Sequence, residues 1–159
     1  MESKKETRLR IARRFIDHFA KLEIDILHTI LADEYHHQFA PASLDPPGPF
    51  DKQGLLDHHI ALREVMVGFP VTAKEYIDSE SESCVTVWAT SRVQFRDDVK
   101  GPDDSEADWA YEGEYIFLIS FDATGERIVR TVEFLDSKQT ADRLVGLMER
   151  ARENTGRLS

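Results

Sequence analysis

Residues 110–121 read AYEGEYIFLISF and residues 127–136 read RIVRTVEFLD, and these two stretches decide the fold. Both are rich in β-branched and aromatic residues, and the turn-like DATGE separates them, which predicts two neighbouring strands. Successive side chains of a strand point to opposite faces, so Tyr111, Gly113 and Tyr115 face the same way. The glycine therefore leaves a space between two phenols, and this space could hold a ligand.

Two earlier segments repeat the strand pattern. PVTAKEYIDS (70–79) and SCVTVWATSRVQF (83–95) are rich in Val, Thr and aromatic residues, and the turns SESE and DDVKGPDDSE follow them. Together with the two stretches above they predict a four-stranded antiparallel meander. Its last strand carries a lone carboxylate, Glu133, between Val132 and Phe134.

The first half of the chain has helical periodicity instead. Apolar residues recur at intervals of three and four over residues 6–20, with basic residues on the far side, and again over residues 24–34. A third helix is predicted over residues 51–68, with Asp51 as its N-cap. Between the second and third helices, YHHQFAP predicts a short strand that Pro41 stops.

These elements define an α+β fold. A curved antiparallel sheet is expected to wrap around the N-terminal helices, and a C-terminal helix that begins near Ser137 is expected to close it. The 159 residues match the size of one ordinary domain, so we expect residues 1–159 to form a single domain.

The last strand is apolar on both faces. Alternation places Ile128, Val132 and Phe134 on one face, and Val129 and Leu135 on the other. One face should therefore meet the helices and the other a second copy of the chain, which predicts a homodimer.

The composition argues against several classes of partner. Thirty acidic and 20 basic residues give a formal net charge of -10, which would repel a nucleic acid. No apolar run approaches the length of a membrane span and no leader-like segment is present, so we expect a soluble, cytoplasmic protein without a membrane partner.

Metal and cofactor chemistry also lack their usual motifs. Cys84 is the only cysteine, and neither adjacent histidine pair has metal-ligand spacing, so no metal is expected. The chain contains no GxGxxG after a strand, no GxxxxGK[ST] and no GxSxG. We therefore expect no cofactor, and a small organic molecule as the substrate.

The order of elements, the GFPVT that ends the third helix and the late EFLD resemble the SnoaL-like branch of the NTF2-like superfamily over residues 6–151. More narrowly, HHQFAP, VWATSRVQF, YEGEYIF and VEFLDS resemble fungal proteins of secondary metabolism. These include meroterpenoid and polyketide cyclases or isomerases, and the brevianamide-type semipinacolases of indole-alkaloid biosynthesis. The resemblance implies a cone-shaped fold whose pocket is served by Tyr111, Tyr115 and Glu133.

Histidines supply further candidates. The semipinacolases also use an arginine on the short strand, where this chain has His36, His37 and Gln38. Only one histidine of an adjacent pair can face the interior, and the sequence leaves open which one does; His37 on the strand and His59 on the third helix are the candidates. An inward histidine could act as an acid or orient Glu133, or it could be a core histidine with satisfied hydrogen bonds.

The candidate residues fall into two groups. The candidate catalytic residues are Glu133, Tyr111, Tyr115 and His37, and the candidate substrate-binding residues are Gln38, His59, Phe39, Met66 and Trp88. Structural alternatives remain open: Glu133 could pair with Arg92 or Arg130 inside the sheet, and the tyrosines could serve packing alone. Asp136 resembles the base of related polyketide cyclases, but its position before SKQTADRL also suits a helix N-cap.

Acid–base chemistry without a cofactor is the leading hypothesis. It describes an isomerase or cyclase acting on an alkaloid, polyketide or meroterpenoid intermediate, including a semipinacolase-like rearrangement. Glu133 would move a proton while Tyr111 and Tyr115 donate hydrogen bonds to a substrate oxygen. The alternatives are a dehydratase similar to scytalone dehydratase and a non-catalytic module that holds a hydrophobic ligand or acts as an adaptor.

Overall fold

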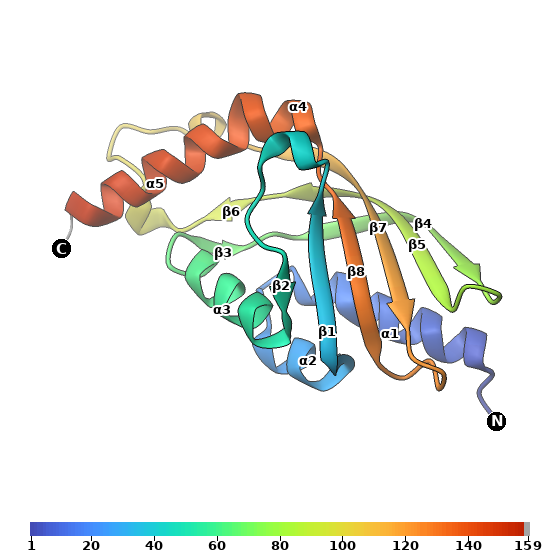
Figure 1. Cartoon of the computed structure of the whole chain (residues 1–159). Coiled ribbons are helices and arrows are strands. Elements are labelled where there is room, and N and C mark those ends of the chain that lie inside the picture. Colours follow the sequence, from blue (N-terminus) through green and yellow to red (C-terminus); the bar gives the residue numbers. More distant parts are fainter. Residues whose placement is uncertain (158–159) are drawn as a thin grey trace.

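Six strands form one curved sheet in the order β2-β1-β8-β7-β5-β4, and the first three helices lie against one face of it (Figure 1). The computed structural model describes residues 1–157. The strands are β1 (Leu31–Ala40), β2 (Phe50–Asp51), β3 (Met66–Gly68), β4 (Val71–Ser79), β5 (Cys84–Arg92), β6 (Gln94–Phe95), β7 (Glu112–Phe121) and β8 (Ile128–Phe134). All pairs are antiparallel except β1 and β8, which are parallel, and β3 and β6 form a separate ribbon.

The helices frame this sheet at its face and at one end. The α-helices are α1 (Lys4–His18), α2 (Ile24–Ile30), α3 (Lys52–Leu62), α4 (Ser137–Gln139) and α5 (Val145–Arg157). A π-helical turn, η4 (Thr140–Leu144), joins the last two, and short 3-10 turns are η1 (Ala42–Leu44), η2 (Asp97–Val99) and η3 (Glu106–Trp109). None of the helices in residues 1–157 is long and apolar enough to cross a membrane.

The expected α+β architecture is confirmed, but two predicted helix ends are wrong. The second helix ends at Ile30 rather than at residue 34, because Leu31 already pairs with Ile128 of β8. The third helix ends at Leu62, and the residues after its last turn form β3. In both places the apolar residues fit the helical period and the strand period, so the sequence pattern alone does not mark the change.

The face assignment of β8 also needs one correction. The register between β7 and β8 shifts, so that Ser120 pairs with Arg130 but Phe121 pairs with Ile128. This bulge turns Ile128 to the buried face, together with Thr131. Val132 and Phe134 stay on the opposite face, as the alternation predicts.

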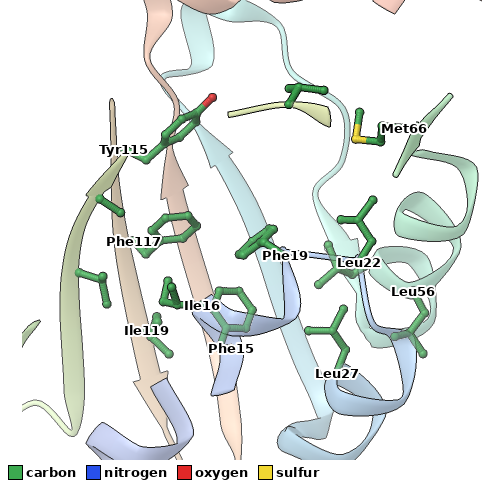
Figure 2. Close-up of a cluster of buried hydrophobic side chains, with 14 of the residues drawn as sticks. Phe15, Ile16, Phe19, Leu22, Leu27, Leu56, Met66, Tyr115, Phe117 and Ile119 are labelled. Carbon is green, nitrogen blue, oxygen red and sulfur yellow. The ribbon is translucent and has the colours of Figure 1, made fainter. Parts of the chain in front are cut away.

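The core lies between α1 and the buried face of β7. Figure 2 shows Phe117 and Ile119 in a row along β7 with Tyr115, and Phe15 of α1 and Phe19, its C-cap residue, packed nearby. The rings of Phe15 and Phe19 lie 6.2 and 5.6 Å from that of Phe117. Each fully buried side chain of this size contributes about 2 kcal/mol through removal from water, so this contact fixes α1 on the sheet.

A buried ion pair adds a second anchor for α1. Arg8 belongs to the basic run expected on the outer side of the helix, but its side chain is only 3% exposed. Its Nε lies 2.7 Å from Oδ1 of Asp78 on β4, and its Nη2 lies 2.8 Å from Oδ2. This paired arrangement satisfies both charges inside the protein.

Candidate active site

Three strand ends bring the candidate residues together. β1 and β8 run parallel and end at the side of the sheet where β7 begins, and α4 and α5 lie across this end (Figure 1). His37, Glu133 and Tyr115 lie near these ends on β1, β8 and β7, and all three side chains are buried. The chain order of the strands therefore gathers residues that are almost a hundred positions apart.

His37 connects two other polar side chains on the buried face. Its Nδ1 lies 2.7 Å from the hydroxyl oxygen of Tyr35, and its Nε2 lies 3.3 Å from Oε1 of Glu133. His37 is 1% exposed, and its Nε2 forms no aligned hydrogen bond within residues 1–157. His37 thus lies between a phenol and a carboxylate on the buried face.

Tyr35 is not among the residues predicted from the sequence, although the strand pattern carries a signal for it. Tyr35, His37 and Phe39 alternate along β1 in the same way as Tyr111, Gly113 and Tyr115 do at the start of β7. Burial raises the pKa of Tyr35, and the nearby charge of Glu133 adds to the rise, so the phenol keeps its proton.

Tyr111 and Tyr115 face the same way, as expected, but their hydroxyl groups meet each other. The two oxygens are 2.5 Å apart, and the side chains are 5% and 2% exposed. A methyl group at Gly113 would overlap the Tyr111 hydroxyl, so the glycine makes room for this phenol pair. The space expected for a ligand is therefore filled by Tyr111 itself. Figure 2 shows the Tyr115 hydroxyl directed away from the apolar core.

Burial raises the pKa of both phenols, and the hydrogen bond between them makes the two pKa values differ. The bond opposes the rise at Tyr111 and adds to it at Tyr115, as expected if Tyr115 is the donor. The charge of Glu133 adds a smaller increase at each. Thr140 of the π-helical turn has a buried hydroxyl close to Tyr111, a neighbour from outside the sheet that no strand pattern indicates.

Of the paired histidines, the structure turns His37 and His59 inward. His36 is exposed and His58 is half-buried, whereas His59 is 3% exposed. His59 Nδ1 lies 3.3 Å from Nε2 of His18 on α1, a residue that the sequence analysis did not single out. Nothing in the periodicity of α1 marks His18, because its contact depends on how α1 and α3 pack.

Two further candidates lie on the inner side. The ring of Phe39 is 4.9 Å from that of His37 and 5.9 Å from that of His58, so Phe39 joins the polar group to α3. Met66 is 3% exposed and belongs to the apolar core. Figure 2 shows Met66 at the edge of that cluster.

Gln38 and Trp88 do not join this group. Gln38 is exposed and pairs with Val132 on the outer face of the sheet. Trp88 is 39% exposed, and its indole nitrogen donates to Glu114 at 2.6 Å. Strand alternation explains both placements, because each residue is one position away from an inward-facing neighbour.

The structure gives Asp136 and Glu133 specific partners. Asp136 caps α4 by accepting from the backbone of Gln139, and its second oxygen accepts from the backbone of Glu114. Arg92 lies 3.7 Å from Glu112, and Arg130 is exposed on the outer face. His37, rather than either arginine, is thus the partner of Glu133.

Two surface hollows lie away from the buried group. One of about 560 Å³ is lined by Lys21, Arg63, Met66, Val67, Arg96, Asp97 and Asp98. Another of about 270 Å³ is lined by His28, Asp33, Asp51, Lys52, Gln53 and Leu56. Both are open to solvent and lined mainly by charged or polar residues. Acid–base groups act most strongly where water is excluded, so we place the candidate site at the buried group. Across residues 1–157, no cluster of three or more His, Cys, Asp and Glu side chains is arranged to hold a metal ion.

A curved sheet wrapped around three helices and closed by a C-terminal helix is the NTF2-like α+β cone. Solved structures share it. BvnE pinacolase from Penicillium brevicompactum is 21% identical with a TM-score of 0.74, over 95% of this chain and 98% of that one. PrhC from Penicillium brasilianum is 13% identical with a TM-score of 0.75, over 96% and 94%.

A third likeness, to a protein described as a SnoaL-like polyketide cyclase from Jannaschia sp., has 10% identity and a TM-score of 0.65 over 95% of each chain. These likenesses confirm the expected SnoaL-like, NTF2-like fold. No known family profile and no curated protein matches the sequence.

Proposed function

We propose that this protein is a cofactor-independent isomerase or cyclase that acts by acid–base catalysis on a secondary-metabolite intermediate. The observation that carries the proposal is the pairing of opposite chemistries on one buried face. Glu133, backed by His37 and Tyr35, can accept a proton, and the Tyr111–Tyr115 pair can donate hydrogen bonds. All five residues are at most 6% exposed, so water competes little with a bound substrate.

The proposed reaction needs only the substrate and these side chains. Glu133 takes a proton from a carbon or hydroxyl group, and the electron pair released moves a bond within the substrate. Negative charge then collects on a substrate oxygen, which accepts a hydrogen bond from Tyr111, while Tyr115 donates to Tyr111. Glu133 returns the proton to another atom, so the product is an isomer of the substrate.

The substrate class is proposed from the structural neighbours. The BvnE likeness favours a semipinacolase-like rearrangement, and the SnoaL-like likeness favours a ring closure. Alkaloid, polyketide and meroterpenoid intermediates all present the oxygenated carbon skeleton that such chemistry requires.

Replacement of Glu133 tests the proposal. Glu133→Gln keeps the size and much of the hydrogen bonding but removes the titrating group, so turnover should fall about 100-fold or more. Purified protein is incubated with oxidised intermediates made by enzymes of its neighbouring genes, beside a no-enzyme control, and product formation is followed by mass spectrometry. Glu112→Gln, an exposed carboxylate on the neighbouring strand, serves as the matched control and should retain wild-type turnover.

The alternatives predict different results. A product that has lost water would indicate a dehydratase, and ligand binding without any product would indicate a binding module. Wild-type turnover in Glu133→Gln would assign the glutamate a structural role.

We also propose a homodimer that pairs the outer faces of two sheets. A row of apolar side chains crosses this face, since Trp88 pairs with Ile116 and Ile116 pairs with Phe134. Trp88 and Phe134 are 39% and 44% exposed, and Ile77 on β4 is 52% exposed. Large apolar side chains gathered on one sheet face are typical of a surface that another chain covers.

A further inference from the structure

Two histidines from different helices face each other inside the protein. His18 on α1 is fully buried, and His59 on α3 is 3% exposed. Their rings are nearly parallel, with centroids 5.1 Å apart and an interplanar angle of 11°. His18 Nε2 lies 3.3 Å from His59 Nδ1, and His18 Nδ1 is hydrogen-bonded to the backbone oxygen of Phe15.

The backbone oxygen of Phe15 determines which ring nitrogens of His18 and His59 carry a proton. A carbonyl oxygen only accepts, so His18 Nδ1 must carry a proton and donate it to Phe15. In neutral His18, Nε2 then carries the lone pair, so His59 Nδ1 must be the donor of the second bond. Neutral His59 is then left with a lone pair at Nε2, which can accept a hydrogen bond.

Both histidines are neutral at pH 7. Burial lowers the pKa of His18 to about 3 and holds that of His59 well below its ordinary value. The titratable groups that face His59 are His18 from α1, His58 from α3 and His37 from β1, and a positive charge on any of them would lower the pKa further. Burial also lowers the pKa of His58, to about 4.

We propose that His59 Nε2 is a hydrogen-bond acceptor for a hydroxyl group of the substrate, and that His18 is the positioning residue that holds His59 in the accepting tautomer. The inference rests on the proposed function and narrows its substrate class. Tyr111 offers a donor from the sheet and His59 offers an acceptor from α3. Ring contacts connect His59 through His58 and Phe39 to His37, with centroids 5.9, 5.9 and 4.9 Å apart in turn. The substrate should therefore carry a hydroxyl group in addition to the oxygen that Tyr111 contacts.

Nitrogen NMR of histidine-labelled protein tests the tautomer directly. Wild-type His59, assigned by the loss of its signals in His59→Gln, should show a protonated Nδ1 and an unprotonated Nε2. His18→Gln can place an acceptor oxygen near the position of Nε2 and should preserve this pattern, whereas His18→Phe should give a mixture of tautomers. A wild-type His59 protonated at Nε2 would overturn the proposal, even if His18→Phe does not fold.

Binding of a rigid alcohol tests the acceptor role. Adding 2-naphthol should shift the His59 Nε2 signal towards that of a hydrogen-bonded nitrogen, and 2-methoxynaphthalene, which has no donor, should not. An unchanged signal at the solubility limit of 2-naphthol, or equal shifts with both compounds, would contradict the proposal. Neither measurement uses turnover, so this inference and the role of Glu133 can fail independently.

Discussion

At the scale of single residues, Gly113 explains why the phenol pair exists. A glycine inside a strand weakens it unless the missing side chain serves a purpose, and here the Tyr111 hydroxyl occupies the place of a Cβ. The two hydroxyl groups are held 2.5 Å apart before any ligand arrives. Such preorganisation lets Tyr111 present its proton without first breaking a bond to water.

Replacement of Gly113 should break this arrangement. In Gly113→Ala the new methyl group would overlap the Tyr111 hydroxyl and crowd the Tyr115 ring, so we expect a loss of about 1 to 3 kcal/mol in unfolding free energy. Turnover should fall as well, because the phenols can no longer meet. Gly146→Ala is the control: an added Cβ there meets nothing within 4 Å, and alanine favours the helix, so stability should be unchanged or slightly higher. Denaturant unfolding of both variants measures the difference.

The two phenols should differ in their importance. Tyr111→Phe removes the group that contacts the substrate oxygen and should cost about 1 to 3 kcal/mol of transition-state stabilisation. Tyr115→Phe leaves that group in place without its supporting donor, so the loss should be smaller, about 1 kcal/mol. The ratio kcat/KM of each variant reports these losses. Equal losses, or a greater loss in Tyr115→Phe, would reverse the assignment of donor and acceptor.

At the scale of elements, the sequence predicted the four strands of the meander and the inward faces of β7 well. Period-two alternation is a local property, so it placed Tyr111, Gly113 and Tyr115 on one face without knowledge of the fold, whereas the family resemblance linked Glu133 to them. The bulge that turns Ile128 inward was not predictable, because it arises from the register between two strands. His18 and Thr140 are near the site only through the packing of α1 and η4, and a helical pattern carries no information about that packing.

The Arg8–Asp78 pair between α1 and β4 gives a pH-dependent prediction. The Arg8 guanidinium holds the pKa of Asp78 below its ordinary value, so the pair stabilises the fold fully above about pH 4, the ordinary pKa of an unfolded aspartate. This contribution is lost as the pH falls through the lower pKa of the folded state. Asp78→Asn leaves Arg8 buried without its charge partner, which should cost about 3 kcal/mol at pH 7.

The difference in unfolding free energy between wild type and Asp78→Asn should therefore be constant to within about 0.5 kcal/mol between pH 5 and 7. Below pH 4 this difference should become smaller. Glu2→Gln provides the control, because the Glu2–Arg10 pair lies on the exposed side of the same helix and should contribute less than about 1 kcal/mol. A difference that does not shrink in acid would show that Asp78 acts through packing rather than through its charge.

At the scale of the whole molecule, the C-terminal helical segment is bound to the residues that precede β7. Arg143 donates to the backbone oxygens of Ala107, Asp108 and Ala110, at 2.9 to 3.0 Å. Farther along α5, Arg150 contacts Asp104 at 2.6 Å. Since the candidate catalytic residues are at most 6% exposed, a substrate reaches them only when the segments or side chains around them move.

The apolar row on the outer face of the sheet predicts that two copies of the protein associate there. A charge introduced among apolar side chains loses its hydration when a second chain covers it, which costs several kcal/mol and weakens association about a thousandfold for every 4 kcal/mol. Phe134→Glu places such a charge beside Ile116 and should give a monomer by light scattering at micromolar concentration, whereas wild type should be a dimer. Ile60→Glu is the matched control: Ile60 is 49% exposed on α3 and the substitution changes the net charge equally, so the dimer should persist. A monomeric wild type, or a dimeric Phe134→Glu, would show that the apolar row on the outer face is not the surface through which two copies associate.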